Sequence, residues 1–377
     1  MKKKLVSLLV CAAMVLTMIT GSAMSVSAEE SIKIGVSIWS STDVLGSQCK
    51  LILDAAAEAL GVEVIYVDQG HVSEQVTASV ETLCAAGCQG IIICNSASSE
   101  MASAIATAQA NGVYLAQFFR YINEESDPDV YALATASPYY VGAVHENEPE
   151  NGETLVNILL ENGCRDIGLI GWEQGDATWL GRWEGYQAGI AAWNEAHPDD
   201  QATLSEPQYA GTTSEGGAKA ANALMSADPE IDALIPAGGG GEPLLGTLSA
   251  VEAAGKVGEI AVVSTDFLPD LGDRLADGSM TGESGGHYCD PLIAFMMVYN
   301  AITGNYTGFE GVYNDVLFPY LYVASTDDYA AYETYFVDQL PYTADELVAM
   351  SQLSLDELKE AAANISIEDA AARAAAR

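Results

Sequence analysis

The segment GESGG at residues 282–286 matches the G-x-S-x-G pattern that exposes a nucleophilic serine between a strand and a helix. A hydrolase built on this pattern needs an acid and then a histidine later in the chain. The last of the four histidines, His287, follows Ser284 by only three residues. The required order is therefore missing, and we interpret the segment as a glycine-rich crossing between two lobes and the chain as a non-enzyme.

The second candidate functional group is an arginine flanked by aromatic rings. Cations are scarce in this chain, which has 14 Lys plus Arg against 53 Asp plus Glu. Arg182 lies between Trp179 and Trp183. A guanidinium group can serve several acceptors at once, and a flat ring can pack on the C–H face of a sugar. Trp183 is expected in the core of a helix over 182–197, and Trp179 in the loop before it. A surface salt bridge is the alternative for Arg182; we favour a binding role because Trp179 and Gly181 surround it.

The glycine run 238–241 follows a predicted strand and precedes a helix. Such a turn can cradle an anion or let the backbone approach a ligand. The chain has no GxxxxGK[ST] pattern, and G-x-G-x-x-G fails at Pro243. We therefore expect no nucleotide cofactor here, and either a flexible turn or backbone approach to a ligand at Gly240, beside Glu242.

Strand and helix patterns alternate along most of the chain. The run 90–94 is apolar throughout, which is typical of a strand buried on both faces of a parallel sheet. Helical spacing over 46–60 stops at Gly61, a suitable residue after a helix end. The other expected strands are 32–38, 62–67, 113–118, 167–171, 208–209, 231–236 and 260–264, and the other main helices are 73–86, 97–110, 141–161, 214–227 and 243–255. This repetition predicts doubly wound parallel sheets with right-handed crossovers.

The pattern restarts after a less regular stretch at 123–138, so we expect two α/β halves of similar size. In such sheets, ligands lie outside the carboxyl ends of the strands. The residues at those ends are mostly polar or aromatic, which suits a small neutral polar ligand. A tail from Thr343 carries three helix starts with capping-box spacing, Thr343/Glu346, Ser354/Glu357 and Ser366/Asp369.

The first residues predict the compartment. Three lysines at 2–4 precede an apolar run at 5–19, and Val26-Ser27-Ala28 resembles a cleavage site. We expect 1–28 to be a cleaved signal peptide, because the run is short for a membrane anchor. The protein is therefore expected outside the cytoplasm, and its net charge of −39 argues against binding nucleic acid or an anionic membrane.

Six cysteines follow residue 28, and they permit fifteen full pairings. One disulfide among Cys49, Cys84 and Cys88 and buried free thiols both remain open as interpretations. The CxxC and CxxH spacings are absent, so we expect no metal site.

From Ile32 to about Tyr335, the chain resembles type I periplasmic binding proteins of the ribose/galactose class, the soluble receptors of sugar ABC transporters. The matching segments are IKIGVSIW, GCQGIIICNSAS, GDATWLGRWEGYQAGI, EPLLGTLSAVEAAGK, VVSTDF and FPYLYVAS. The resemblance implies two Rossmann-like lobes joined by a three-stranded hinge that close on a ligand. It places the N-terminal lobe at 31–136 plus 287–318, the C-terminal lobe at 137–286 plus 319–342, and a helical tail at 343–377.

The resemblance also implies site residues. The binding asparagine of the family matches Asn95, its sugar-gripping arginine matches Arg182, and its acid after a late strand matches Asp266. The chain departs from the family at Phe119-Arg120, at Gly240-Gly241 and at Gly286, with His287 beside it, which argues against ribose or galactose itself. The expected ligand-binding residues are Trp39, Ser40, Asn95, Phe119, Arg120, Ser137, Trp172, Trp179, Arg182, Gly240, Glu242, Asp266 and His287.

The first hypothesis is a monomeric, cofactor-free solute-binding protein that delivers a sugar or small polyol to an ABC transporter permease. The second is a sensor that presents a quorum signal or nucleoside to a membrane receptor. A hydrolase using Ser284 or an acid pair is the third and least favoured.

Overall fold

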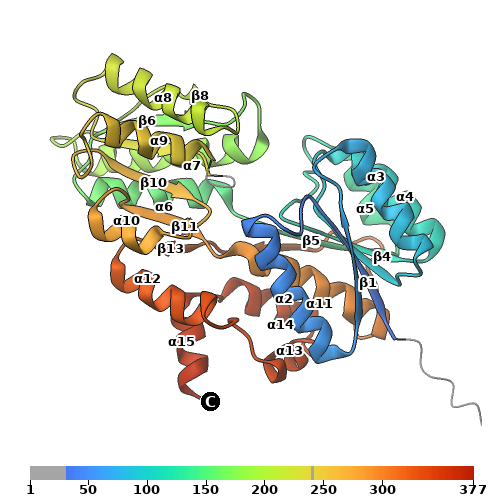
Figure 1. The fold of residues 1–377 in the computed structure, drawn as a ribbon. Helices are drawn as coiled ribbons and strands as arrows, with labels where there is room; N and C mark the ends of the chain where they lie inside the picture. Colours follow the sequence, from blue (N-terminus) through green and yellow to red (C-terminus); the bar gives the residue numbers. More distant parts are fainter. Residues whose placement is uncertain (1–30, 239–241) are drawn as a thin grey trace, which may run out of the picture. The chain divides into compact units, whose positions relative to one another are not determined.

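The computed structural model describes residues 31–238 and 242–377 (Figure 1). The expected signal peptide at 1–28 and the predicted ligand contact Gly240 lie outside these residues. Residues Lys33–Arg377 form one compact unit.

The first sheet has six strands in the order β12-β5-β4-β3-β1-β2, all parallel. The strands are β1 (Lys33–Ile38), β2 (Glu63–Asp68), β3 (Gly90–Ile93), β4 (Tyr114–Phe118), β5 (Tyr140–Glu146) and β12 (Asp315–Phe318). The strand order reverses direction at β1, which is the point where open α/β sheets leave a crevice for ligands.

The second sheet follows the order β13-β11-β10-β9-β6-β7, with β8 also paired to β6. Its strands are β6 (Asp166–Gly171), β7 (Thr203–Leu204), β8 (Gln208–Tyr209), β9 (Ala233–Pro236), β10 (Ala261–Thr265), β11 (Gly282–Gly285) and β13 (Leu321–Val323). Only β13 is antiparallel to its neighbour, β11. The prediction of two doubly wound sheets is thus confirmed, with one antiparallel strand at an edge.

Helices cover both faces of each sheet (Figure 1). In the first lobe they are α2 (Val44–Leu60), α3 (Ser73–Ala85), α4 (Ser98–Asn111), α5 (Pro128–Ala136) and α11 (Asp290–Thr303). In the second they are α6 (Glu148–Glu161), α7 (Ala177–Ala196), α8 (Ser214–Ala227), α9 (Glu242–Ala253), α10 (Leu271–Asp277) and α12 (Thr326–Tyr332). The pair α2 and α11 packs opposite the pair α3 and α4, and the pair α6 and α7 opposite the pair α8 and α9.

The predicted helix 141–161 is wrong in its first part. Residues 140–146 form β5, which is buried at every position and pairs with β4. The helix begins only at Glu148, where Asn147 accepts a hydrogen bond from Glu150 N and Pro149 occupies the first turn. The chain therefore first leaves the first sheet after Glu146, and the expected lobe boundary at 136/137 is also wrong. The stretch 123–138, expected to be irregular, contains α5.

Two further expectations differ from the structure. Helix α7 begins at Ala177 rather than at Arg182, because the Asp176 side chain accepts from Trp179 N and caps it there. Most of the GESGG segment forms β11, and the crossing begins at Gly286, whose φ of 74° suits glycine. A one-turn 3-10 helix at His287–Cys289 then leads into α11.

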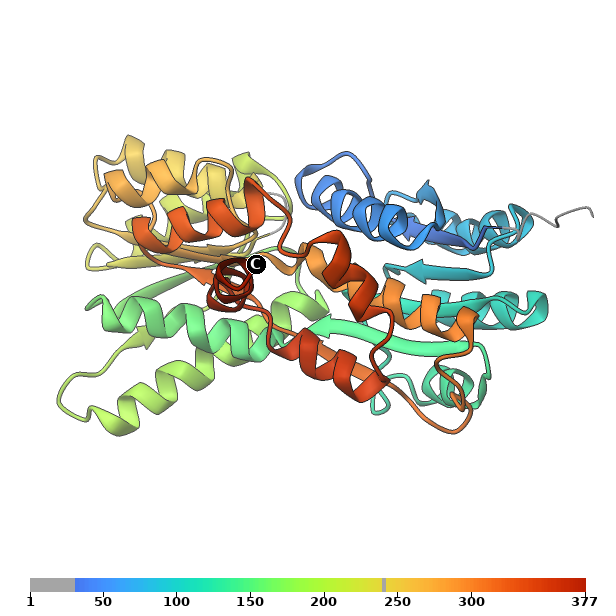
Figure 2. The ribbon, with the colours of Figure 1, turned by 90° about the horizontal axis from the view of Figure 1, so that it is seen from below.

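The tail forms the three expected helices, α13 (Ala344–Met350), α14 (Leu355–Ala363) and α15 (Ile367–Ala375). Each begins at its predicted Thr or Ser cap. In Figure 2 the tail, in dark red, lies on the face turned toward the viewer. Helix α13 packs on α2 and α14 packs on β12, whereas α15 contacts α12 and the π-helix Glu333–Val337. The tail thus contacts elements of both lobes.

The six cysteines after residue 28 are free thiols, so the structure favours the interpretation without a disulfide. None of the helices in the described part of the chain has the length and apolar character needed to cross a membrane.

Candidate functional site

A cavity of about 740 Å³ lies at the carboxyl ends of β3, β4 and β5. The first lobe lines it with the loops that follow these strands, and the second lobe with the first turns of α6 and α7. Of the predicted ligand residues, Asn95, Phe119 and Arg120 line it. This position agrees with the rule that ligands of open α/β sheets bind beyond the carboxyl ends of strands.

Asn95 is held in place by its neighbours. It is 3 % exposed, its Oδ1 accepts from Gln117 Nε2 at 2.7 Å, and its Nδ2 donates to the Ala97 carbonyl at 3.0 Å. Gln117 is itself fixed, since its Oε1 accepts from the Tyr140 hydroxyl at 2.6 Å. The amide is therefore preorganised at the wall of the cavity.

The backbone of Phe119 adopts a left-handed conformation, with φ of 58°, which is rare for a bulky residue. Its N–H donates to Asp290 Oδ1 at 3.2 Å, and its carbonyl accepts from Arg120 Nη1 at 2.7 Å. Strained backbone of this kind persists where surrounding contacts fix it, and it often marks a functional site. Asp290, at the start of α11, is thus a positioning residue for the turn that carries Arg120.

Aromatic rings form a row from β1 to the hinge. Trp39 stacks on His71, with ring centroids 5.8 Å apart, and contacts Phe119 at 5.7 Å. Phe119 contacts His287 at 5.3 Å, and His287 contacts Tyr320 at 4.9 Å. A flat ring can pack on the C–H face of a sugar, and of these five rings Phe119 alone is part of the described cavity lining.

The predicted residues His287 and Asp266 follow the ends of two different strands and lie beside each other. His287 Nε2 lies 3.3 Å from Asp266 Oδ1. Burial lowers the pKa of His287 despite the opposing effect of Asp266, so the imidazole is neutral at pH 7. A neutral imidazole that directs its Nε2–H at Asp266 keeps Nδ1 as an acceptor, and this buried atom has no hydrogen-bond partner among the described residues.

The Arg182 side chain is occupied by protein groups. Its Nε donates to Glu148 Oε2 at 2.6 Å, and its Nη2 donates to Glu148 Oε1 at 3.3 Å and to the Tyr320 hydroxyl at 3.1 Å. Arg182 is 3 % exposed, and its Nη1 has no partner among the described residues. The salt bridge considered for Arg182 therefore exists, but it is buried between two of the crossings that join the lobes.

Several predicted residues do not reach the cavity. Trp179 is fully buried in the core with Tyr186 and does not face a ligand. Ser137 ends α5 before β5, at the amino edge of the first sheet, which is the wrong edge for this cavity. Trp172 is half-buried, with its ring 5.3 Å from the Arg182 guanidinium. Ser40 accepts from Asp43 N ahead of α2, and Glu242 is exposed at the start of α9.

The buried carboxyl pair Glu146 and Asp290 is not among the predicted site residues. Burial, followed by the nearby Glu148, raises the pKa of Glu146 to about 8. Burial, followed by Glu146, also raises the pKa of Asp290. Because both groups are buried and Glu146 disfavours the charge of Asp290, the pair retains a proton at neutral pH. The sequence does hold one signal for this place. Asn147 and Pro149 are typical of a helix start, so they predict a strand-to-helix turn that Glu146 and Glu148 flank.

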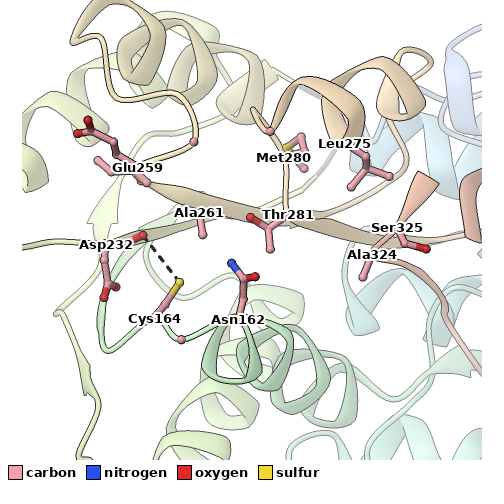
Figure 3. Close-up of a pocket in the computed structure, with 14 residues that line it drawn as sticks. Asn162, Cys164, Asp232, Glu259, Ala261, Leu275, Met280, Thr281, Ala324 and Ser325 are labelled. Carbon is pink, nitrogen blue, oxygen red and sulfur yellow. Dashed lines mark hydrogen bonds between the residues drawn. The ribbon is translucent and has the colours of Figure 1, made fainter. Parts of the chain in front are cut away.

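A second cavity, of about 490 Å³, lies at the opposite edge of the second sheet (Figure 3). Figure 3 shows Asn162, Cys164 and Asp232 beside the starts of β6, β9 and β10. The Cys164 thiol donates to the Asp232 carbonyl at 3.9 Å. Because this is the amino edge of the parallel strands, we do not assign ligand binding to it.

Within residues 31–238 and 242–377, no three His, Cys, Asp or Glu side chains are grouped so as to hold a metal ion.

Comparison with known proteins gives a family match. The sequence model of the periplasmic binding protein domain matches residues 34–302. No curated protein sequence matches the chain.

Solved structures share the fold. A protein from Mycobacterium smegmatis in complex with β-D-fucofuranose is 18 % identical, with a TM-score of 0.63 over 85 % of this chain and 98 % of that one. An ABC transporter periplasmic solute-binding protein from Actinobacillus succinogenes with bound D-allose is 16 % identical, with a TM-score of 0.65 over 78 % and 98 %. An ABC transporter solute-binding protein from Bacillus halodurans with bound myo-inositol is 21 % identical, with a TM-score of 0.62 over 80 % and 97 %.

Proposed function

Since the chain belongs to the periplasmic binding protein family, we propose that it captures a sugar or small polyol in the 740 Å³ cavity and delivers it to an ABC transporter permease. Proteins of this kind bind a solute and do not transform it. Similar structures with bound D-allose and myo-inositol support a ligand of this class.

The observation that carries this proposal is the cavity itself, which both lobes line. Asn95 and Arg120 contribute polar groups from the first lobe, and Glu148 and Thr178 contribute them from the second. A volume of this size is in the range of pockets that take small molecules. The polar groups would bind hydroxyls, and the ring of Phe119 would cover an apolar face of the ligand.

The proposed mechanism is a shift in the population of lobe arrangements. A ligand that contacts both lobes binds the closed arrangement more tightly than any other, and so favours it. The three crossings act as the hinge, at 146–148, at 285–290 and at 318–321. A permease then reads the ligand-bound arrangement.

The protein is proposed to act outside the cytoplasm, as its family implies. The lysines at 2–4, the apolar run at 5–19 and the Val26-Ser27-Ala28 site support a cleaved signal peptide at 1–28. We propose that the mature protein is a monomer.

A thermal-shift screen of the exported protein against sugars, polyols and nucleosides tests the function. A ligand that binds only the folded state raises the melting temperature by mass action. We expect at least one sugar or polyol to do so. A response to nucleosides alone would support the sensor hypothesis instead, and no response to any sugar or polyol would contradict the proposal.

A further inference from the structure

The order of the strands gives the cavity a polar end and an apolar end. At the polar end, the loops after β3 and β4 bring Asn95 and Arg120 to its wall. The next strands in the sheet, β5 and β12, bring His145 and Leu317. The order β12-β5-β4-β3 therefore places an aliphatic side chain at one end of this row and an amide at the other.

An aromatic surface lies at the apolar end. Tyr121 stacks on His145, with ring centroids 4.1 Å apart and an interplanar angle of 23°. The His145 ring is held at both nitrogens, since Nδ1 lies 3.0 Å from the Glu146 carbonyl oxygen and Nε2 lies 2.7 Å from Asp315 Oδ1. Tyr121 is 44 % exposed. It thus rests on a fixed ring while much of its own surface remains open.

Leu317 extends this surface. It lies opposite His145 in the ladder between β12 and β5. Asp315, two residues earlier on β12, contacts the same His145 side chain, and residues two apart in a strand share a face. Leu317 therefore lies on the face of His145, and it is 49 % exposed. The second lobe adds Leu180, in the first turn of α7, which is 43 % exposed.

These three exposed side chains are grouped rather than scattered. Tyr121, Leu180 and Leu317 all line the same cavity. Single exposed apolar residues are common on protein surfaces, but several that line one concave site are typical of a surface that binds an apolar group. The free protein therefore keeps an apolar wall open to water on the side of the cavity away from Asn95.

The size of the cavity favours a ligand larger than one sugar ring. Its volume of about 740 Å³ equals that of about 25 water molecules, at about 30 Å³ each. A single hexose has about half that number of non-hydrogen atoms, so it fills about half of the space. The polar end is enough for the hydroxyls of one hexose, and the apolar end is left for another group.

From this arrangement we propose that the ligand is a glycoside, a sugar joined to a flat apolar group, and that Tyr121, Leu317 and Leu180 bind the apolar group. The sugar hydroxyls would contact Asn95 and Arg120. The flat group would stack on the exposed part of the Tyr121 ring and cover the two leucines, and both contacts remove apolar surface from water. This inference rests on the proposed function and specifies its ligand.

The test compares ligands that share a sugar and differ in the attached group. Methyl and phenyl β-D-glucopyranoside, with the corresponding galacto and manno pairs, are titrated by calorimetry. We expect the phenyl glycoside of the best series to bind about tenfold more tightly than the methyl glycoside, because burial of an apolar group of this size contributes about this much. Adenosine and uridine, whose flat groups are polar, should bind more weakly than that phenyl glycoside.

Variants assign the effect to the apolar wall. Tyr121→Ala, Leu317→Ser and Leu180→Ser should each lower the ratio of phenyl to methyl affinity by about threefold, since aromatic and aliphatic contacts to the phenyl ring are lost. All three positions are exposed, so the variants should fold. Tyr209→Ala is the matched control, because Tyr209 is 40 % exposed and lies outside the described lining of the cavity. It should leave the ratio unchanged.

The outcomes separate the two proposals. A methyl glycoside that binds as tightly as its phenyl counterpart in every series would overturn the glycoside assignment and leave sugar capture standing. A preference for phenyl that persists in all three wall variants, or nucleosides that bind more tightly than every phenyl glycoside, would overturn it as well. Failure of every sugar, polyol and glycoside to bind would overturn the proposed function itself.

Discussion

The carboxylate of Glu148 accepts two hydrogen bonds from the Arg182 guanidinium, through Nε at 2.6 Å and Nη2 at 3.3 Å. The Tyr320 hydroxyl completes the group by donating to Glu148 Oε1 at 3.0 Å. Glu148 follows the first crossing between the lobes, and Tyr320 lies in the third. One buried arginine therefore connects two strands of the hinge.

Removing one member of this pair should destabilise the fold. Arg182→Leu leaves the Glu148 carboxylate without its cation, and loss of one partner of a buried pair typically costs about 3–5 kcal/mol. Urea denaturation of Arg182→Leu, Glu148→Gln and the double variant measures this effect. We expect the double variant to lose less stability than the two single losses together. Strict additivity would show that the two side chains act independently.

Stability should depend on pH through Glu146. Its pKa is raised to about 8 in the folded state, because burial and the nearby Glu148 disfavour its charge. Between the ordinary pKa of a glutamate and pH 8, the folded state binds more protons than the unfolded state, so the free energy of unfolding falls as pH rises. Urea denaturation between pH 5 and pH 8.5 should show this fall.

The variant Glu146→Gln should make that fall shallower, since an amide does not titrate. Glu58→Gln, at an exposed position on α2, is the control and should keep the slope of the parent protein. Equal slopes in Glu146→Gln and the parent would contradict the assignment to Glu146.

The contact between α6 and α7 depends on glycine. A Cβ at Gly185 would lie 1.9 Å from the Pro149 carbonyl oxygen, so the two backbones approach more closely than alanine allows. Gly185→Ala should therefore destabilise the protein by about 1–3 kcal/mol through overpacking, despite the better helix propensity of alanine. Ala188→Ser, at an exposed position on α7, should have little effect in the same urea titration. A Gly185→Ala variant as stable as the parent would show that the helices separate at no cost.

Arg373 should stabilise the tail. Its Nη1 donates to the Pro341 carbonyl at 2.6 Å and to Glu346 Oε1 at 3.1 Å, and its Nε donates to Asp369 Oδ2 at 2.9 Å. Arg373→Ala should therefore cost about 1–3 kcal/mol in the free energy of unfolding.

Arg274 provides the matched control for Arg373. Its side chain is 23 % exposed, as that of Arg373 is, and it pairs with Asp270 across one helical turn of α10. Arg274→Ala should cost less than about 1 kcal/mol, the usual range of a surface pair. Equal losses would contradict a special role for Arg373.

The alternation of apolar strands and helices was enough to predict both sheets, because buried parallel strands and glycine-terminated helices leave local signals. The strand β5 was missed because its apolar residues run directly into the helix that follows. The change occurs at Asn147-Glu148-Pro149, where a cap and a proline mark a new helix start.

The site was harder to predict, because its contacts join distant parts of the chain. Trp179, Arg182, Tyr186 and Ile190 recur at helical spacing, and all four are buried on one side of α7. Such spacing indicates the buried face of a helix, which favours a place for Trp179 in the core over a place in a ligand loop. The partner of Arg182, Glu148, lies 34 residues earlier, and no local pattern connects them.

Calorimetric titration of Arg120→Ala with the polyol that binds the parent protein most tightly tests the central claim most directly. Arg120 lines the cavity, and loss of a hydrogen bond to a charged donor costs about 1.5–3 kcal/mol. We therefore predict a dissociation constant raised by about tenfold or more, with Arg274→Ala unchanged. An unchanged dissociation constant in a folded Arg120→Ala variant would show that the solute binds elsewhere.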